Sequence, residues 1–499
     1  MTASEAWRSL HPLSPVVNLL PRLLATARAA WPLALALVFG RGGRVEVFDL
    51  GLFALPLGVA VLGSVLHWAS LRWRVVDGRL EIRTGIFVRQ VRVIAADRVQ
   101  HVSTIQRLTH RMVGLVELEV ETAAGREVEG LLSALSRADA EELIAGLRGA
   151  APAPIGGRWV TNDLGDLFRF GATGTRWGIA FAVFGTLFEV VQWRDPTRLE
   201  SMGVALGILG GSAFALALLS GTWLVSTGLA MLRHWGFTLS ERGDALVCEE
   251  GLFTRRRVEI RPGKVQTVSV HEPWLRRLVG VASVVVSTAA ARSRGGGTER
   301  AEAMVPVVDP EEVPALLHRV APEIPHDLAS IPRRPADPRG RVRALARAGL
   351  RTAILAAVIT ALVWPWGLVS FAAVPVALSA AELGFRAQRW AITPTVLLAE
   401  GGWWRRTAVV VPRAKVQVVW VAAGPFLRRR GLAQLSVAVA GGRVSLPILD
   451  AALAEALAAE IRDLPRPLRP PPPTSGGESE APRSPPPDSL PAGTTPSPE

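Results

Sequence analysis

The chain has 499 residues, of which 49% are hydrophobic, and a formal net charge of +13 at pH 7. So much apolar sequence in a chain of this length, with a mean hydropathy of +0.29, is not typical of a soluble protein, and membrane-spanning segments are expected. The single cysteine, Cys248, excludes intrachain disulfides and cysteine-based zinc sites.

Six stretches are long and apolar enough to cross a bilayer, because a spanning helix needs about 20 mainly apolar residues. They form three pairs, which run over residues 20–40 and 50–71, 177–193 and 202–232, and 350–364 and 367–385. Arginines flank every pair, whereas the short loops inside the pairs are nearly neutral. By the positive-inside rule, the termini and the segments between pairs are predicted to be cytoplasmic. Because the arginines flank the spans and do not form a separate basic stripe, no nucleic-acid partner is expected.

Two acidic residues, Glu189 and Glu382, fall within the predicted spans. Each lies near one end of its span, where a charged side chain can reach the headgroup region. The spans are therefore interpreted as membrane anchors. The alternative is a transporter- or channel-like subunit, for which polar groups near the bilayer midplane are expected.

One sequence unit follows each pair of spans, and its landmarks recur without gaps. A glycine opens each copy, and the same interval leads to a basic residue followed by Val-Gln. A second constant interval leads to a glycine with an arginine three residues before it. In chain order the landmarks are Gly85, Arg98, Gln100, Arg111 and Gly114; Gly251, Lys264, Gln266, Arg277 and Gly280; and Gly402, Lys415, Gln417, Arg428 and Gly431. Such coincidence predicts an internal triplication.

Each unit is expected to fold as short antiparallel strands closed by one amphipathic helix. Apolar runs broken by turn residues predict the strands. The tryptophans that open the units are Trp73, Trp235 and Trp390. Side chains suited to capping mark the start of each closing helix. These are Ser136 with Asp139, Asp309 before Pro310, and Asp450.

The fold class is accordingly membrane α-helical plus β, with six transmembrane helices in three pairs and a β domain after each pair. The predicted divisions are 1–72 (N-terminal segment and spans 1–2), 73–149 (domain 1), 150–234 (linker and spans 3–4), 235–321 (domain 2), 322–389 (linker and spans 5–6), 390–464 (domain 3) and 465–499 (tail). The tail is rich in Pro, Ser, Gly and Thr, a composition typical of disorder.

The layout of helix pair, Gly-x-Phe/Trp, Arg/Lys-Val-Gln, Arg-x-x-Gly and closing helix resembles bacterial membrane proteins with PH-like domains, of the YdbS/YdbT kind. The similarity covers about residues 10–463. It implies a PH-like β-barrel or sandwich of two curved antiparallel sheets with a C-terminal helix. It also implies a bacterial cytoplasmic membrane protein that is multi-pass.

The repeated polar residues are candidates for binding membrane lipids or a protein partner, because cations near a membrane attract acidic groups. The alternative interpretation is structural: the basic Val-Gln strand fixes a turn, and the Arg-x-x-Gly segment ends a short helix. Trp403 and Trp404, beside Arg405 and Arg406, suit a membrane surface. The full candidate set is Arg98, Gln100, Arg111, Lys264, Gln266, Arg277, Lys415, Gln417, Arg428, Trp403 and Trp404.

The loop that is basic in lipid-binding eukaryotic PH domains is different here. Its counterparts are 77–79, 241–244 and 393–395, which contain Asp, Glu, Thr and Pro besides single arginines. The resemblance therefore does not imply phosphoinositide specificity.

No catalytic motif is found in the sequence: it has no HExxH, no P-loop and no Gly-x-Ser-x-Gly elbow. We therefore expect no enzymatic activity, no cofactor and no metal. The function predicted is that of a scaffold that presents three cytoplasmic PH-like domains for protein or lipid binding. A membrane or cytoplasmic protein is the expected partner, for example a two-helix relative with a single PH-like domain.

Overall fold

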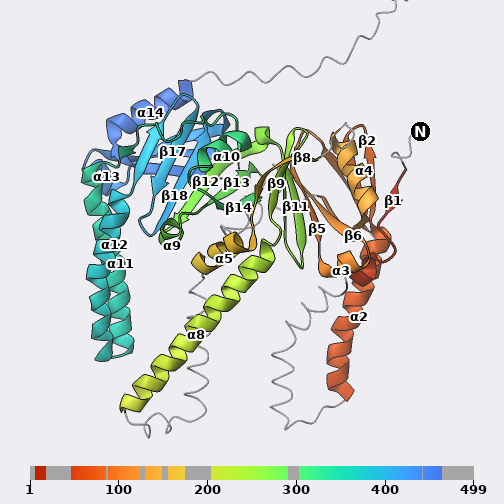
Figure 1. Cartoon of the computed structure of the whole chain (residues 1–499), viewed down its shortest axis with the longest axis horizontal. Coiled ribbons are helices and arrows are strands. Elements are labelled where there is room, and N and C mark those ends of the chain that lie inside the picture. The colour runs from red at the N-terminus through yellow and green to blue at the C-terminus, as the bar shows by residue number, and fades with distance from the viewer. Residues whose placement is uncertain are drawn as a thin grey trace, which may run out of the picture. The chain divides into compact units, whose positions relative to one another are not determined.

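The computed structural model describes residues 6–17, 19, 47–85, 88–122, 130–148, 155–174, 204–289, 303–440 and 442–463. The first and third predicted spans, Glu189 and the predicted tail lie outside these residues. Three successive repeats share one order of elements (Figure 1).

In the first repeat the strands are β1 (Arg8–Ser9), β2 (Arg72–Val76), β3 (Arg79–Thr84), β4 (Gln90–Ala95), β5 (Val99–Gln106), β6 (Leu115–Thr122) and β7 (Gly130–Ser136). The helices are α2 (Val47–Ser70), α3 (Leu108–Met112) and α4 (Arg137–Arg148). Strands β1 to β4 form one sheet, and β5 to β7 belong to another.

In the second repeat the strands are β8 (Ile155–Thr161), β9 (Thr238–Arg242), β10 (Ala245–Glu250), β11 (Arg255–Ile260), β12 (Val265–Pro273), β13 (Ala282–Thr288) and β14 (Ala303–Val308). The helices are α5 (Leu164–Thr173), α8 (Val204–Arg233), α9 (Trp274–Leu278) and α10 (Val313–Val320).

In the third repeat the strands are β15 (Arg334–Pro335), β16 (Arg389–Ile392), β17 (Val396–Gly401), β18 (Arg405–Pro412), β19 (Val416–Ala422), β20 (Leu432–Val439) and β21 (Gly442–Asp450). The α-helices are α11 (Arg341–Leu362), α12 (Ala373–Arg386), α13 (Pro425–Arg428) and α14 (Ala451–Asp463), and the 3-10 turns η4 (Pro338–Gly340) and η5 (Trp366–Ala372) precede α11 and α12.

Each repeat begins with a strand that lies before its apolar helices in the sequence. Strands β1, β8 and β15 pair antiparallel with β2, β9 and β16, which follow those helices. Segments expected to be linkers, 150–157 and 322–339, therefore contain the start of β8 and all of β15. The two-residue strands are too short to show a period-2 pattern, so only the pairing partner reveals them.

The sheets do not end at the repeat boundaries. Two seven-stranded sheets have the orders β7-β6-β5-β11-β10-β9-β8 and β14-β13-β12-β18-β17-β16-β15. In each, the second half of one repeat is joined to the first half of the next through one antiparallel pair, β5 with β11 and β12 with β18 (Figure 1). We call these pairs the first and second junctions. The domains predicted on the two sides of 149/150 and of 321/322 thus share a sheet.

Within each repeat the two half-sheets and the closing helix enclose a core, as expected for a PH-like sandwich. In the first repeat, Trp73 from β2, Leu118 from β6 and Leu143 from α4 belong to one buried cluster. Trp390 is the counterpart of Trp73 in the third repeat, and both are 3% exposed. Trp235 is not their counterpart: it is 38% exposed, and Leu239 of β9 takes the buried position.

The repeated glycines are explained by backbone geometry. Gly85, Gly251 and Gly402 have φ values of 97°, 105° and 85°, and a Cβ at each would overlap the carbonyl oxygen three residues later. Gly114, Gly280 and Gly431 have φ values of 64° to 70° and follow the short helices α3, α9 and α13. Left-handed φ values are readily adopted only by glycine, so the landmarks mark obligatory turns.

Two of the three predicted caps are confirmed. The Asp139 amide donates to Ser136 Oγ at 3.0 Å, and the Ala452 amide donates to Asp450 Oδ1 at 3.0 Å. The third prediction, a cap by Asp309, is wrong. Helix α10 begins at Val313, and its N-cap residue, Glu312, makes no side-chain capping hydrogen bond. The Asp309 carbonyl instead accepts from the Glu312 amide in the preceding turn.

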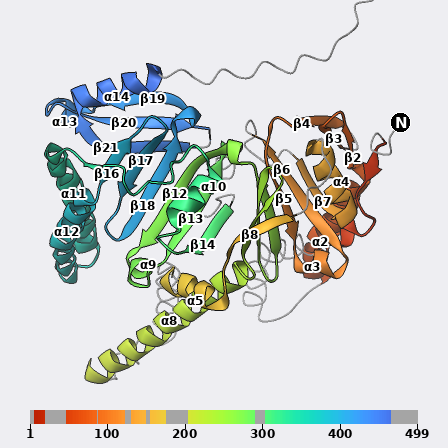
Figure 2. The same cartoon turned by 45° about the horizontal axis from the view of Figure 1, so that its top comes forward.

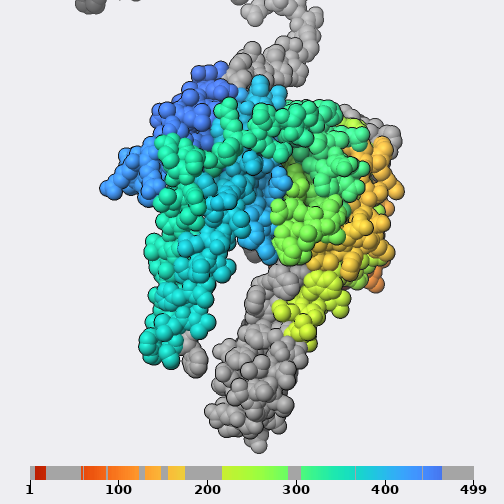
Figure 3. All heavy atoms as spheres, turned by 60° about the vertical axis from the view of Figure 1, so that its left-hand side comes forward, coloured from red at the N-terminus to blue at the C-terminus, as the bar shows by residue number. Residues whose placement is uncertain are grey.

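Among the described residues, two helical segments have the length and composition of membrane spans, Pro338–Leu362 and Gly367–Arg386. In the most apolar stretch of each segment, 6% and 0% of the residues are buried within the protein. Figure 3 shows α11 and α12 as a rod of exposed side chains. Helices α2 and α8, with 24 and 30 residues, lie where the second and fourth spans are predicted.

Candidate interaction surface

The two lysines of the chain lie at the junctions and contact the preceding repeat. Lys264 Nζ donates to the Asp97 carbonyl at 2.8 Å, and Lys415 Nζ donates to the Gly263 carbonyl at 2.6 Å. Asp97 and Gly263 each stand one residue before the basic landmark of their own repeat, so the two contacts are equivalent. Burial and, secondarily, Arg261 lower the pKa of Lys264, but the carbonyl contact gives the ammonium a partner.

The repeated arginines contact the following repeat in the same way. Arg111 Nη1 donates to the Leu252 carbonyl at 2.6 Å, and Arg277 Nη2 donates to the Trp403 carbonyl at 2.6 Å. Leu252 and Trp403 each follow the opening glycine of their repeat. Four of the sequence-predicted site residues, Lys264, Lys415, Arg111 and Arg277, therefore join repeats to one another.

The remaining members of the two series stand at the ends of the chain of repeats. Arg98 and Arg428 are exposed, and no hydrogen bond or ion pair of either side chain is found among the described residues. The Gln100 and Gln266 amides donate locally to the carbonyls of Arg98 and Lys264, both at 3.4 Å. Gln417, at the same repeat position, is exposed.

The adjacent tryptophans of the third repeat lie at the second junction. The Trp404 ring lies 4.9 Å from the Trp274 ring and 5.5 Å from the Trp403 ring, measured between centroids. The Trp274 amide also donates to the Trp404 carbonyl at 2.8 Å. Trp404 is 50% exposed, so it serves the junction and still presents an aromatic face.

Sequence reasoning missed a buried arginine beside this junction. The guanidinium of Arg276 donates to Ser283 Oγ at 2.5 Å and lies 4.2 Å from the Phe170 ring. Burial and, secondarily, Arg405 lower its pKa to about 10. His110 and Leu427 occupy the same position in the other repeats and are also buried. Because this position holds a different residue in each repeat, it gives no repeated pattern in the sequence.

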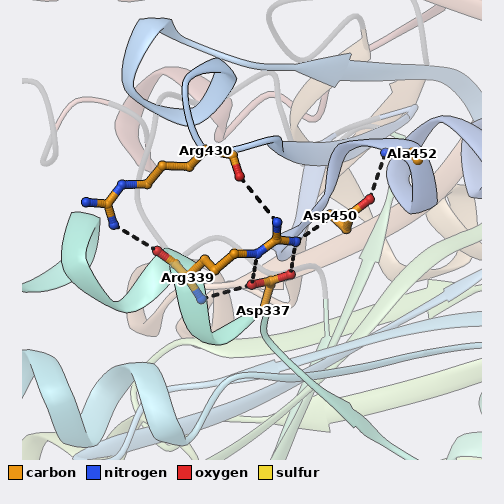
Figure 4. Close-up of polar contacts among 5 residues, drawn as sticks. All are labelled: Asp337, Arg339, Arg430, Asp450 and Ala452. Carbon is orange, nitrogen blue, oxygen red and sulfur yellow. Dashed lines mark hydrogen bonds and ion pairs between the residues drawn. The ribbon is translucent and has the colours of Figure 1, made fainter.

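Figure 4 shows a cluster of charged groups that joins the start of α11 to the closing helix α14. Arg339 Nη2 lies 2.8 Å from Asp337 Oδ2 and 2.7 Å from Asp450 Oδ2. Arg430 Nη1 and the Arg339 carbonyl are 3.5 Å apart. The Arg339 guanidinium holds the pKa of the Asp337 carboxyl below its ordinary value. Arg430 and Asp450 lie more than 90 residues after Arg339 in the sequence, so no local sequence pattern reveals the cluster.

A third missed feature is a pocket of about 570 Å³ between α11 and the strands of the third repeat. Four arginines line it: Arg343, Arg347, Arg405 and Arg443. The acidic lining residue Glu400 already has ion-pair partners, Arg333 at 3.0 Å and Arg406 at 3.6 Å. Positive charge therefore predominates at this opening.

The described part of the chain contains no group of three or more His, Cys, Asp or Glu side chains that could hold a metal ion. Cys248 is buried, and burial raises the pKa of its thiol well above the ordinary value. Its thiol therefore stays protonated and poorly reactive.

The repeats agree with comparisons to known proteins. The family model for the bacterial PH domain matches residues 24–151, 170–324 and 344–464. The UPF0699 transmembrane protein YdbT of Bacillus subtilis (strain 168) is 23% identical over 470 residues, which cover 87% of this chain and 92% of the relative. No solved structure matches the chain significantly. The three matched segments together account for most of the sequence, and the chain belongs to the bacterial PH domain family.

Proposed function

We propose that this chain is a multi-pass cytoplasmic-membrane protein whose three PH-like repeats form a binding scaffold on the cytoplasmic side. The observation that carries the proposal is the pair of equivalent junctions, in which main-chain pairing joins successive repeats. Repeats joined in this way hold their surfaces at fixed spacing, as in other repeat proteins that act through extended surfaces. Tethering several binding domains to one membrane also raises their effective concentration for a partner.

The proposed topology has six spans with cytoplasmic termini and repeats. It rests on the arginine distribution, on two exposed apolar helices in the third repeat, and on the name of the relative, a transmembrane protein. Each predicted helix pair follows the first strand of its repeat in the sequence. A strand and its pairing partner must lie on the same side of the membrane, which favours an even number of spans in each insertion.

The surroundings of Glu382 favour a scaffold over a carrier. Its carboxylate lies 2.6 Å from Arg341 Nε and 2.7 Å from Arg386 Nε, so its charge is balanced by two arginines. Arg386 follows the predicted span, so this carboxylate lies near the end of the helix, whereas a carrier is expected to place its polar groups near the bilayer midplane. Under the proposal, Glu382→Gln leaves any solute flux unchanged, and a loss of flux in reconstituted vesicles would favour the carrier.

Co-purification from native membranes tests the scaffold directly. Wild-type protein is compared with Arg428→Ala, which removes an exposed cation that has no partner among the described residues, and with Arg429→Ala as the matched control. The expected result is a protein partner, identified by mass spectrometry, that is lost only from the Arg428 variant. Recovery of no specific partner by the wild type would count against a scaffold.

Acidic lipid headgroups are a second candidate ligand, favoured by the arginine-lined pocket beside α11. Clustered cations near a membrane contribute about 1 kcal/mol each toward an anionic surface. Native mass spectrometry of the purified chain tests this candidate. Retention of phosphatidylglycerol is expected to fall in Arg405→Gln with Arg443→Gln, and to be unchanged in the control Arg429→Gln. Equal retention of phosphatidylglycerol by all three proteins would exclude the pocket as the lipid-binding site.

A further inference from the structure

The two junctions have the same register. At the first junction Val258 of β11 pairs with Ser103 of β5. At the second, the residues in the same repeat positions, Val409 and Ser269, pair with each other. The lysine-to-carbonyl and arginine-to-carbonyl contacts recur with the same equivalence. One geometry of association is thus used twice within the chain.

Two strands that occupy junction positions are paired on one side only among the residues the structure describes, β4 with β3 and β19 with β20. Strand β4 corresponds to β11 and β18, and strand β19 corresponds to β5 and β12, but β4 and β19 lie at sheet edges (Figure 2). Val93 of β4 is 54% exposed, whereas its counterparts Glu259 and Val410 are 5% and 1% exposed.

The other free edge shows the same contrast. Val418 of β19 is 54% exposed, whereas its counterparts His101 and Thr267 are 3% and 9% exposed. Strand β19 also contains no charged residue and no proline, and its register irregularity between Val416 and Val418 recurs at the equivalent positions of the paired strands β5 and β12. Natural proteins usually protect edge strands with charges, prolines or bulges against pairing with other chains. An apolar edge without charge or proline is therefore suited to pairing.

We propose that β4 of one copy of this chain pairs antiparallel with β19 of a second copy, which forms a third junction between molecules. This inference rests on the proposed scaffold function and names its partner. The register follows from the internal junctions: Gln90 opposite Ala422, Val91 opposite Val421, Arg92 opposite Trp420, Val93 opposite Val419, and Ile94 opposite Val418. By the same equivalence, Arg98 of one copy donates to the Ala414 carbonyl of the other.

The proposed contact accounts for two observations together. It buries the valines that are exposed on β4 and β19, and it gives Arg98 the partner that Lys264 and Lys415 already have. Because the two edges differ, the contact is heterologous, and a pair of chains still has one free β4 and one free β19. Additional copies can therefore join until a ring closes or a filament forms.

Disulfide cross-linking in native membranes tests the register. Two differently tagged full-length chains are co-expressed, one with Arg92→Cys and the other with Trp420→Cys. Opposed residues in an antiparallel pair have Cα atoms about 4.5–5.5 Å apart, within the range that a disulfide spans. The expected product is a disulfide-linked species with both tags. Cys248 is buried and does not compete for disulfide formation.

The control pairs Trp420→Cys with Arg79→Cys, which lies on the interior strand β3. It is expected to give no disulfide-linked species with both tags.

A second test uses variants in which the edge strands β4 and β19 carry a charge. Val93→Lys and Val418→Lys place charges on exposed positions, so the fold is expected to keep its melting temperature while the two-tag species is largely lost. The inference is overturned if only same-tag species form, if the cysteines link to a different protein, or if the wild type is monomeric at all membrane densities. Linkage to a different protein would leave the scaffold function intact, whereas a topology that places the repeats outside the cytoplasm would remove the proposed function alone.

Discussion

At the scale of single residues, the repeated cations show how one sequence signal can have two interpretations. Lysines and arginines in equivalent positions suggest a ligand site, and the same residues can instead join repeats. Four of the six contact backbone carbonyls of a neighbouring repeat. A carbonyl acceptor has no sequence signature, so the distinction depends on where the neighbouring turn lies.

The difference between internal and terminal positions gives a matched test. Arg277→Ala removes a charged hydrogen bond to the Trp403 carbonyl and is expected to destabilise the protein by about 0.5–1 kcal/mol, since the contact is exposed. Arg428→Ala removes no such bond to any residue that the structure describes and is expected to leave the melting temperature unchanged. Tryptophan fluorescence during thermal unfolding in detergent measures both. Equal shifts for the two variants would contradict the assignment of Arg277 to the junction.

Two histidines, the buried His110 and the half-buried His271, predict the direction of the pH dependence. Burial lowers the pKa of His110, and burial with Arg276 and Arg405 lowers the pKa of His271, both from an ordinary value of 6.5. As the pH falls below about 6.5, the unfolded chain takes up these protons and the folded protein does not, so the free energy of unfolding decreases. We expect the melting temperature to fall between pH 7 and pH 5.

The control for this prediction is the variant His110→Gln with His271→Gln. Its melting temperature is expected to depend less on pH over the same interval, because glutamine does not titrate. A variant that retains the full wild-type slope would assign the acid sensitivity to other groups.

At the scale of elements, the junction strands are distinguished by what lies beside them and not by composition. Strands β11 and β4 have the same place in their repeats, but the second edge of β11 pairs with β5, whereas β4 pairs with β3 alone in the described chain. The alternating pattern of a strand indicates which face is buried, but it carries no information on whether the edge is paired.

The start of α14 offers a prediction for a single element. Asp450 both caps the helix through the Ala452 amide and pairs with Arg339. Asp450→Asn keeps a capping oxygen and loses the ion pair, whereas Asp450→Ala loses both. Hydrogen exchange in residues 451–463 is therefore expected to be slowest in the wild type, faster in the Asn variant and fastest in the Ala variant. Identical exchange in Asn and Ala variants would show that the cap contributes nothing.

At the scale of the whole molecule, the proposed topology predicts which surfaces meet the cytoplasm. Cys248 is buried, so new surface cysteines can be labelled against a low background. Asp244→Cys, in a position whose side chain is 73% exposed, is expected to react with a membrane-impermeant maleimide only after the cells are opened. Ser201→Cys, between the third and fourth predicted spans, is expected to react in intact cells. The reverse pattern would invert the topology.

The sequence by itself determined the repeat, the glycine turns, the strand-and-helix composition of each unit and the positions of those apolar helices that the structure describes. These depend on local rules: which residues accept left-handed φ, which cap a helix and which intervals are apolar. Only the tertiary structure decided that the sheets cross the repeat boundaries, that a strand precedes each helix pair and that the cations join repeats. Edge pairing and contacts with carbonyl groups are made by the backbone, which is the same in every residue, so the amino-acid sequence does not encode them in any single position.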